Sequence, residues 1–465
     1  MSQEPDKFHV EEAPRIKQDL LERIRREVDR FGRTSQDSAM LRAEVRVLGL
    51  DSIDWLCAQR PMARGYWADR EEAFEVAGTG RADMIAGDVS EPFVDVVVRL
   101  MERITSCSGD IRYIGGFRFD ERGNHDPAWG RFKSYRFILP RFEVLRRGNE
   151  TILACNMRSD DSLDQVASEI NSLILPDGPV PESLPIPIHR RNHPDLIQWE
   201  SMVRSVLEGI ELGKYKKIVL AREVVLEFER PVTPPYLLKA LKANSRSCFH
   251  FCFQPHPTSA FVGASPERLY RRDGKLLKTE AIAGTRPRGS SETEDATFRR
   301  ILLESRKDKI EHQFVVDSIR ESISTQTVSL DIEARPSILS LTHAQHLITR
   351  FEGHLDEFVS DGQLLETLHP TPAVGGLPRE EALDEIARLE PFDRGWYAAP
   401  VGWIGRDAAQ FVVGIRSGLI DGNRLHLYSG AGIVADSDPR DEWDEVENKI
   451  ADFLDVLSTY EQERL

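Results

Sequence analysis

The chain has 465 residues, of which 40% are hydrophobic and 30% are charged, a composition that supports a large folded core and excludes a disordered polymer. It carries 61 lysine and arginine residues against 77 aspartate and glutamate residues, for a formal net charge of -16. Such an acidic surface repels phosphate backbones and anionic headgroups, which argues against nucleic acid or membrane as the main partner. If the ligand is an anion, its site therefore needs a local cluster of cations or a metal ion.

Several features bear on the compartment. The start of the chain, Met1 to Phe8, is charged and lacks the apolar core of a secretory signal. The longest apolar runs, such as Ile218 to Ala221, are far shorter than a membrane span. The five cysteines are scattered and odd in number, which suits a reducing compartment better than a disulfide framework. We therefore expect a cytoplasmic protein.

The first predicted element is an amphipathic helix between Pro14 and Phe31, where apolar residues recur at helical spacing. Short alternating runs from about Leu41 to Leu153 then predict strands of an antiparallel sheet. Six prolines between Leu175 and Pro194 predict a linker, because proline at that density continues neither a helix nor a central strand. We expect residues 1–194 to supply helix and sheet and residues 195–465 to form a second half.

In the second half, helices and strands interleave without a regular period and without an internal repeat. A helical stripe from Ile197 to Ile210 precedes a β-rich run from Lys217 to Phe228, and Asp273-Gly274 signals a hairpin. Further helices are predicted at 297–323, 379–389 and 439–457. Further strands are predicted at 401–404, 410–415 and 424–428. This order predicts an α+β protein with a large mixed or antiparallel sheet, and not a Rossmann fold or a barrel.

Two lysines at the mouth of a very apolar strand form the first candidate site. Strand alternation puts Lys217 on one face and Arg222 on the other, so one cation is expected to point inward. A lysine drawn into a poorly solvated pocket near other cations loses its proton more easily and can act as a general base. The alternative, which spacing alone favours, is that Lys216 and Lys217 are a solvated strand start.

The second candidate is Glu267, in the turn Gly263-Ala-Ser-Pro-Glu-Arg268 that follows an apolar run. A glutamate held at a rigid turn beside a core can be kept protonated by desolvation and serve as a general acid. The alternative is an exposed turn glutamate paired with Arg268.

Backbone and loop features supply further candidates. In Ala283-Gly284-Thr285, the Gly-Thr step lets backbone N–H groups approach an anion, and Arg286 and Arg288 add charge; alternatively, the segment is only a strand exit. Residues 368–376 read as a helix end followed by a tight loop of the kind that lines a pocket. His346 is either a donor to a ligand or a structural histidine.

Acidic residues on two predicted helices form a candidate metal site. Glu442, Glu445 and Lys449 fall on one helical face, and Glu311 lies on another helix. Carboxylates that converge from separate helices suit Mg²⁺ and leave positions for water and a substrate carboxylate. The alternative is an ordinary salt bridge between Glu445 and Lys449.

The order and spacing of these motifs closely resemble the chorismate-utilising enzymes, and isochorismate synthases in particular. The resemblance covers nearly all of Asp195 to Leu457 and reaches into the N-terminal half at 115–120 and Trp129. It includes the 50-residue separation of Lys217 and Glu267. It implies a single large α+β domain of two stacked, largely antiparallel sheets with helices outside, formed by both halves of the chain.

By this resemblance, Lys217 activates water for attack at C2 of chorismate, and Glu267 protonates the departing C4 hydroxyl. Glu311 and Glu445, with Glu442 close by, would hold Mg²⁺ against the C1 carboxylate. The family pattern places a further set of residues around the substrate: Ala283, Gly284, Thr285, His346, Ala373, Tyr397, Arg416, Gly430, Ala431, Gly432 and Lys449.

Three positions bear on the subgroup. Anthranilate synthases carry glutamine where Lys217 stands, and aminodeoxychorismate synthases tend to carry a lysine where Ala283 stands, so both departures point to water as the nucleophile. Relatives with lyase activity often have threonine where Ala373 stands, so Ala373 favours stopping at isochorismate. The alternatives are a salicylate synthase, which goes on to eliminate pyruvate, and a catalytically inactive chorismate-binding relative.

The resemblance also bears on pathway and partners. The long N-terminal half resembles the menaquinone type of isochorismate synthase, with siderophore synthesis as the other pathway. We expect chorismate as the substrate, no obligate glutaminase partner, and a monomer or weak dimer.

Overall fold

A computed structural model describes residues 8–31, 39–107, 109–181 and 183–462. Residues 1–7, on which most of the prediction of no secretory signal rests, lie outside these ranges. Within them, the structure contains no helix with the length and apolar character needed to cross a bilayer.

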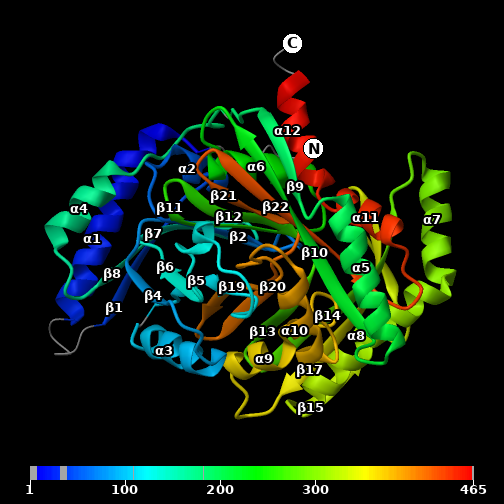
Figure 1. The fold of residues 1–465 in the computed structure, drawn as a ribbon. Helices are drawn as coiled ribbons and strands as arrows, with labels where there is room; N and C mark the ends of the chain where they lie inside the picture. The colour runs from blue at the N-terminus through cyan, green and yellow to red at the C-terminus, as the bar shows by residue number, and fades with distance from the viewer. Residues whose placement is uncertain (1–7, 32–38, 108, 182, 463–465) are drawn as a thin grey trace.

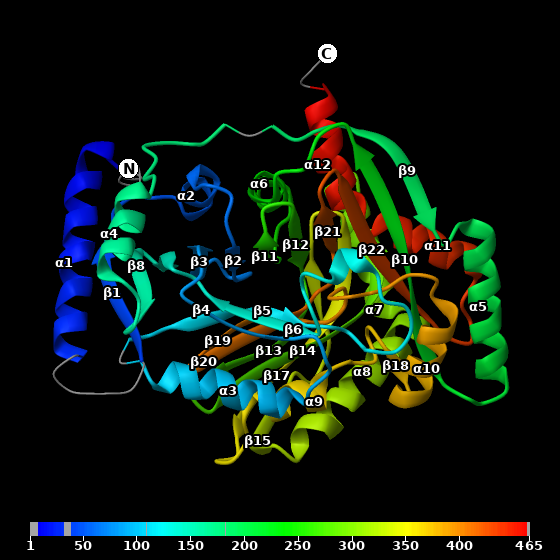
Figure 2. The same ribbon diagram turned by 60° about the vertical axis from the view of Figure 1, so that its left-hand side comes forward.

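The strands form two sheets in which every pair of neighbours is antiparallel (Figures 1 and 2). The larger sheet has 12 strands, in the spatial order β1 (Met40–Arg46), β8 (Glu150–Arg158), β7 (Phe142–Arg147), β3 (Phe74–Thr79), β2 (Arg64–Ala68), β11 (Phe249–His256), β12 (Ser259–Ser265), β21 (Ser417–Asp421), β22 (Arg424–Ile433), β10 (Lys217–Phe228) and β18 (Gly376–Leu377), with β9 (Pro187–His193) also paired to β10.

The smaller sheet has 10 strands, in the order β15 (Thr327–Ile332), β17 (Ala344–Leu355), β14 (Leu276–Pro287), β13 (Arg268–Asp273), β20 (Ala408–Val413), β19 (Pro400–Gly405), β5 (Arg112–Phe117), β6 (Tyr135–Leu139) and β4 (Asp83–Gly87), with β16 (Ser337–Ser340) also paired to β17. Each sheet contains strands from before and after residue 194, so both halves of the chain contribute to both layers. The prediction of an α+β protein with two stacked antiparallel sheets is confirmed.

Helices cover the outer faces of the stacked sheets (Figure 2). Their bounds are α1 (Ala13–Phe31), α2 (Ser52–Ala58), α3 (Phe93–Thr105), α4 (Leu163–Ser172), α5 (Leu196–Glu211), α6 (Pro234–Asn244), α7 (Glu292–Glu304), α8 (Arg306–Ser324), α9 (Asp361–Leu368), α10 (Arg379–Leu389), α11 (Pro439–Asn448) and α12 (Ala451–Gln462). In Figure 2, α2 and α6 lie above the larger sheet, and α3, α8 and α9 lie below the smaller one.

Strand alternation explains the layers. On β11, Phe251 and Phe253 point into the core between the sheets, where the Phe253 ring stacks on Trp396 with ring centroids 5.0 Å apart, whereas Cys252 points into the outer cluster shared with α2 and α6. This two-sided burial makes the central strands apolar on both faces, because neither face reaches water.

Some predicted boundaries differ from those observed. The predicted linker contains β9, which begins at Pro187 and pairs with β10 alone; proline is tolerated at the first residue of such a strand. The predicted helix 297–323 is two helices, because the Ser305 side chain accepts a hydrogen bond from Asp308 N and starts α8. The short helix α2 and the helix α3 were not distinguished from the surrounding strands.

Candidate active site

A cavity of about 380 Å³ lies where β10 and β22 of the larger sheet approach β14, β17, α8 and α11. This volume is typical of a pocket for a small metabolite. We call it the central cavity. Lys217 and Glu267 both line it, as do Glu311, Glu442 and Glu445.

Lys217 is the first residue of β10, and its side chain points into the central cavity while only 1% of the residue is exposed. Its Nζ donates a hydrogen bond of 2.9 Å to Glu311 Oε1 on α8. Gly432, on the neighbouring strand β22, makes room for it, because a Cβ at that position would lie 2.7 Å from Lys217 Cε. The alternative interpretation, in which both lysines lie at a solvated strand start, is therefore wrong for Lys217. It holds for Lys216, which is exposed.

Glu267 lies in the turn between β12 and β13 and is 4% exposed. The Ser265 hydroxyl fixes this turn, since it donates to Val413 O at 2.7 Å and accepts from Glu267 N at 3.2 Å. Arg268 is paired with Glu71 at 2.6 Å, so the alternative of an exposed Glu267–Arg268 pair is wrong.

Two features keep the Glu267 carboxyl in its neutral form. Burial, followed by the nearby negative charge of Glu280, raises the pKa of Glu267 to about 8, while Lys217 and Lys449 act in the opposite direction. Among the described residues, none donates a hydrogen bond to this carboxyl that would stabilise its charge. A carboxyl group in this state holds a proton at neutral pH and can give it away.

The segment Ala283-Gly284-Thr285 forms a bulge in β14, and all three residues line the central cavity. The pairing with β17 slips by one residue between Ala283 and Thr285, and Gly284 adopts a φ of 76°, which glycine tolerates best. The approach to α8 is close here, because a Cβ on Gly284 would lie 3.1 Å from Asp308 Cβ.

His346 lies on β17 opposite this bulge. Its Nδ1 is 3.0 Å from Thr285 Oγ1 and 3.3 Å from Gly284 O, whereas its buried Nε2 has no hydrogen-bond partner among the described residues. Burial, followed by the charges of Arg416 and Lys449, lowers the pKa of His346 to about 3. The ring therefore stays neutral and has one nitrogen available.

Tyr397 and Arg416 complete another wall of the central cavity. The Tyr397 ring stacks on Tyr428 with ring centroids 5.3 Å apart. Arg416 is 7% exposed, and its Nη1 lies 3.5 Å from Asp452 Oδ2 on α12. A phenol and a guanidinium at one wall are suited to binding a carboxylate.

Residues 430–432, which were predicted as a loop, belong to strand β22, and strand alternation sorts them. Gly430 and Gly432 line the central cavity, and Lys449 Nζ donates to Gly430 O at 2.8 Å. The structure places Ala431 elsewhere, because its side chain packs into a core cluster with Ile218 and Leu220 on the opposite face of the sheet. Ala373, in the loop after α9, lines the cavity.

The three glutamates converge on the central cavity from α8 and α11. Burial, followed by the charge of Glu445, raises the pKa of Glu442 to about 7, and Glu311 adds to this effect. Burial also disfavours charge on Glu445, but Lys449 beside it, with 2.6 Å between Nζ and Oε1, lowers the pKa of Glu445. The predicted alternative of a Glu445–Lys449 salt bridge therefore exists, and it lies within the cavity.

This donor set fits Mg²⁺. The carboxylates are oxygen donors, and their mutual repulsion would be relieved by a bound cation. Across the described ranges, no three histidine, cysteine, aspartate or glutamate residues form a complete metal cluster. A Mg²⁺ ion bound here would therefore have to complete its coordination shell with water and substrate oxygens.

With every acidic side chain counted as ionised, the formal charges along the cavity wall are balanced. Five of the described residues that line it are basic: Lys217, Arg286, Lys307, Arg416 and Lys449. Five others, not counting Glu267, are acidic: Asp308, Glu311, Asp441, Glu442 and Glu445. The predicted cation cluster is therefore present, but carboxylates accompany it. An anionic ligand needs further positive charge, which a divalent cation would supply.

The sequence prediction missed Lys307 and misplaced two residues, Ala431 and Arg288. Lys307 lies at the cavity rim with its Nζ 3.8 Å from Glu442 Oε1; its position four residues before Glu311 on α8 was the available signal. Arg286 lines the cavity and is paired with Asp308 at 2.6 Å. Arg288, by contrast, pairs with Asp295 at 2.6 Å and is not among the cavity residues described above.

Comparison with known proteins agrees with this geometry. The model of the family described as chorismate binding enzyme matches residues 24–458, and the chain belongs to that family. It is 33% identical over 411 residues to the isochorismate synthase MenF of Escherichia coli, covering 88% of this chain and 90% of that protein.

One further relative and one solved structure carry related names. The chain is 36% identical over 363 residues to the salicylate biosynthesis isochorismate synthase of Pseudomonas aeruginosa, covering 75% of this chain and 74% of that protein. The solved structure of the menaquinone-specific isochorismate synthase from Escherichia coli matches with a TM-score of 0.81 at 30% identity, over 94% of this chain and 99% of that one. The protein is thus an enzyme of the isochorismate synthase family, as the motifs predicted.

Proposed function

We propose that the enzyme converts chorismate to isochorismate with water as the nucleophile. The observation that carries this proposal is the pairing of a buried amine and a buried, neutral carboxyl group in one cavity, Lys217 at the start of β10 and Glu267 after β12. A general base and a general acid at one ring are what an allylic substitution needs, whereas a protein that only binds the metabolite has no use for them.

Lys217 is the proposed base. A neutral Lys217 amine accepts a proton from water as the water oxygen forms a bond to C2 of chorismate. In the structure Lys217 Nζ donates to Glu311, so the side chain must turn its lone pair away from this contact and towards the water to act as a base.

Glu267 is the proposed acid. As the ring double bonds shift, the C4–O bond breaks and the leaving hydroxyl takes the proton of Glu267 to depart as water. Its pKa of about 8 keeps that proton in place at neutral pH. One water enters and one leaves, so the overall reaction is an isomerisation.

The remaining cavity residues are proposed to bind the two carboxylates of chorismate. Arg416, Tyr397, Lys449 and the bulge N–H groups supply donors. Glu311, Glu442 and Glu445 would hold Mg²⁺, which supplies positive charge to the C1 carboxylate when bound. The balanced charge of the cavity wall supports this assignment, because the wall alone does not neutralise a dianion.

We further propose that the product enters menaquinone synthesis. The support is the match to the menaquinone-specific structure along 94% of this chain, which includes the N-terminal half. The test is restoration of menaquinone in a bacterium that lacks its own menaquinone isochorismate synthase.

Product analysis tests the reaction itself. Purified enzyme is incubated with chorismate and Mg²⁺, and the products are separated. Isochorismate alone is the expected result. Salicylate with pyruvate would make the protein a salicylate synthase, and anthranilate formed only with ammonia would contradict water as the nucleophile. Thermal stabilisation by chorismate without turnover would identify an inactive binding protein.

A further inference from the structure

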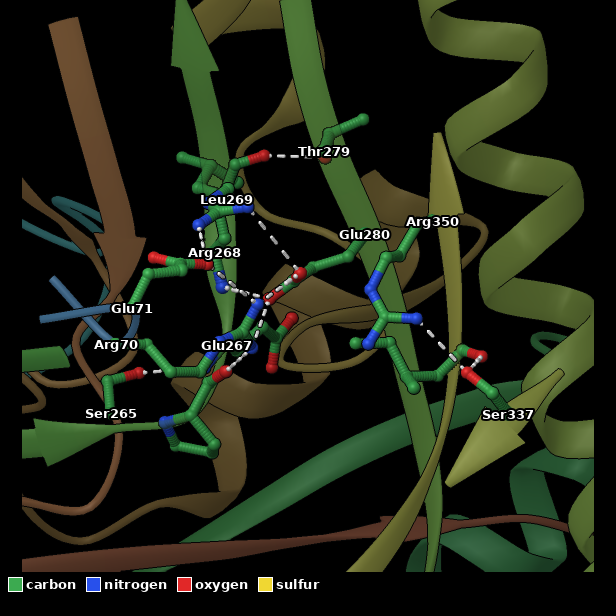
Figure 3. Close-up of polar contacts among 12 residues, drawn as sticks. Arg70, Glu71, Ser265, Glu267, Arg268, Leu269, Thr279, Glu280, Ser337 and Arg350 are labelled. Carbon is green, nitrogen blue, oxygen red and sulfur yellow. Dashed lines mark hydrogen bonds and ion pairs between the residues drawn. The ribbon is translucent and has the colours of Figure 1, made fainter. Parts of the chain in front are cut away.

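Glu280, on β14, is a buried carboxylate beside Glu267 that takes no part in the proposed chemistry. Only 1% of its side chain is exposed. It accepts two hydrogen bonds from Arg70, from Nη1 to Oε1 at 2.9 Å and from Nη2 to Oε2 at 2.8 Å (Figure 3). Such a two-pronged contact fixes the relative orientation of both groups.

This ion pair is attached to both neighbours of Glu267. Arg70 Nη1 also donates to Pro266 O at 2.9 Å, and Arg268 N donates to Glu280 Oε1 at 3.0 Å. The backbone is therefore tied to the pair immediately before and immediately after Glu267, as Figure 3 shows. The guanidinium carbons of Arg70 and Arg268 lie 5.1 and 5.2 Å from the centre of the Phe249 ring, which supports both side chains.

We infer that Arg70 and Glu280 are positioning residues that hold the Pro266–Arg268 turn, and with it the Glu267 carboxyl, in place at the central cavity. The inference rests on the proposed role of Glu267 as the acid. Arg70 lies between β2 and β3, so a residue of the N-terminal half fixes a group that the C-terminal half presents to the substrate.

A purely structural role is the competing explanation. A buried ion pair is weak evidence for stability, because its desolvation costs about as much as its attraction returns. Here, however, the Glu280 carboxylate accepts hydrogen bonds from Arg70 and from Arg268 N, and its Oε2 lies 4.0 Å from Arg268 Nη1, so these contacts go to Arg70 and to the residue that follows Glu267. That distribution favours the positioning role.

The pair also shapes the electrostatic surroundings of Glu267. The charged or titratable groups that face its carboxyl are Glu280 from β14, Lys217 from β10, Lys449 at the end of α11, and Tyr397. Glu280 is the negative one among them. Replacing it with glutamine keeps the shape and removes the charge, which makes it a sharp test.

The first measurement is the steady-state rate of Glu280→Gln. We expect kcat to fall roughly 10- to 100-fold with KM for chorismate nearly unchanged, because a misplaced acid slows the chemical step without removing a substrate contact. Arg70→Gln should act similarly, and the double variant should lose less than the product of the two single losses because the residues act as a pair. Should Glu280→Gln not fold, Arg70→Lys tests the same contact, since a lysine cannot reproduce the two-pronged geometry.

The matched control is Arg350→Gln. Arg350 lies opposite Glu280 on β17 and lines the same second cavity, of about 750 Å³, as Arg70 and Glu280 do. It pairs with Glu333 at 3.0 Å, and its side chain is 48% exposed. It has no described contact with the turn, so this variant should keep the wild-type rate.

A second readout needs no turnover, so it separates failure of this inference from failure of the proposed function. The infrared band of the protonated Glu267 carboxyl, assigned by its absence in Glu267→Gln, is followed against pH. In Glu280→Gln the band should vanish at lower pH than in wild type, because a negative neighbour has been removed. An unchanged titration together with an unchanged kcat would overturn the inference.

Discussion

Lys217 Nζ lies 2.9 Å from Glu311 Oε1, so the proposed base and a proposed metal ligand form one ion pair between β10 and α8. The pair is largely shielded from solvent, with side-chain exposures of 2% and 19%. Because the two side chains are in direct contact, a change at either residue alters both proposed functions. For each variant, the binding affinity and the catalytic rate must therefore be measured separately.

Lys217→Ala should lower kcat roughly 100- to 10,000-fold, the usual contribution of a general base, while chorismate binding stays measurable by calorimetry. Lys216→Ala is the matched control. The side chain of Lys216 is exposed, so its removal should not affect the rate. Near-normal turnover by Lys217→Ala would show that another group accepts the proton.

The pH dependence of kcat/KM should reveal the proton on Glu267. An acid must be protonated to act, and its raised pKa means that activity is present below about pH 8 and is lost as pH rises through that value. Glu267→Gln should remove this limb along with most of the activity. Glu352→Gln changes an exposed glutamate that pairs with Lys278 on the surface. This variant should keep both the activity and its loss above about pH 8. A wild-type rate that still rises well above pH 8 would exclude Glu267 as the acid.

We expect turnover to require a metal ion that the three glutamates bind. EDTA should abolish turnover and Mg²⁺ should restore it, and Glu445→Gln should weaken Mg²⁺ binding at least about tenfold, since even outer-shell partners of a metal contribute 10- to 100-fold. Asp444→Asn, on the same helix with 62% of its side chain exposed, is the control. Full activity in EDTA would dismiss the metal site.

Gly432→Ala should displace the proposed base, Lys217, although Lys217 itself is not substituted. An added Cβ would lie 2.7 Å from Lys217 Cε and 2.9 Å from Glu311 Oε1, so one of these side chains must move. We expect kcat to fall roughly 10- to 100-fold, as for other misplacements of about 1 Å, and a crystal structure of the variant should show the shift. Gly178→Ala, where the added carbon meets nothing within 4 Å, should behave as wild type.

Periodicity predicted much of the fold, because each strand or helix must bury its own apolar face. The bounds of β10 and α10 were predicted as observed. The strand β9 was missed because its sequence is dominated by proline and polar residues, and its place depends on pairing with β10.

The site was predictable only in part. Alternation offered Lys217 an inward face, but burial decided between that and the solvated alternative, and burial depends on the whole fold. The convergence of α8 and α11 is likewise a tertiary fact that no local pattern carries. Arg70, which is 196 positions from its partner Pro266, has no motif of its own and could not be found from the sequence.

The most direct test of the proposed chemistry is turnover of chorismate in water labelled with the heavy oxygen isotope, with the product examined by mass spectrometry. Attack by solvent at C2 predicts isochorismate that carries one labelled oxygen, in its C2 hydroxyl. Isochorismate without the label, formed by moving the original hydroxyl from C4 to C2, would contradict the assignment of Lys217 and Glu267 as an opposed base and acid.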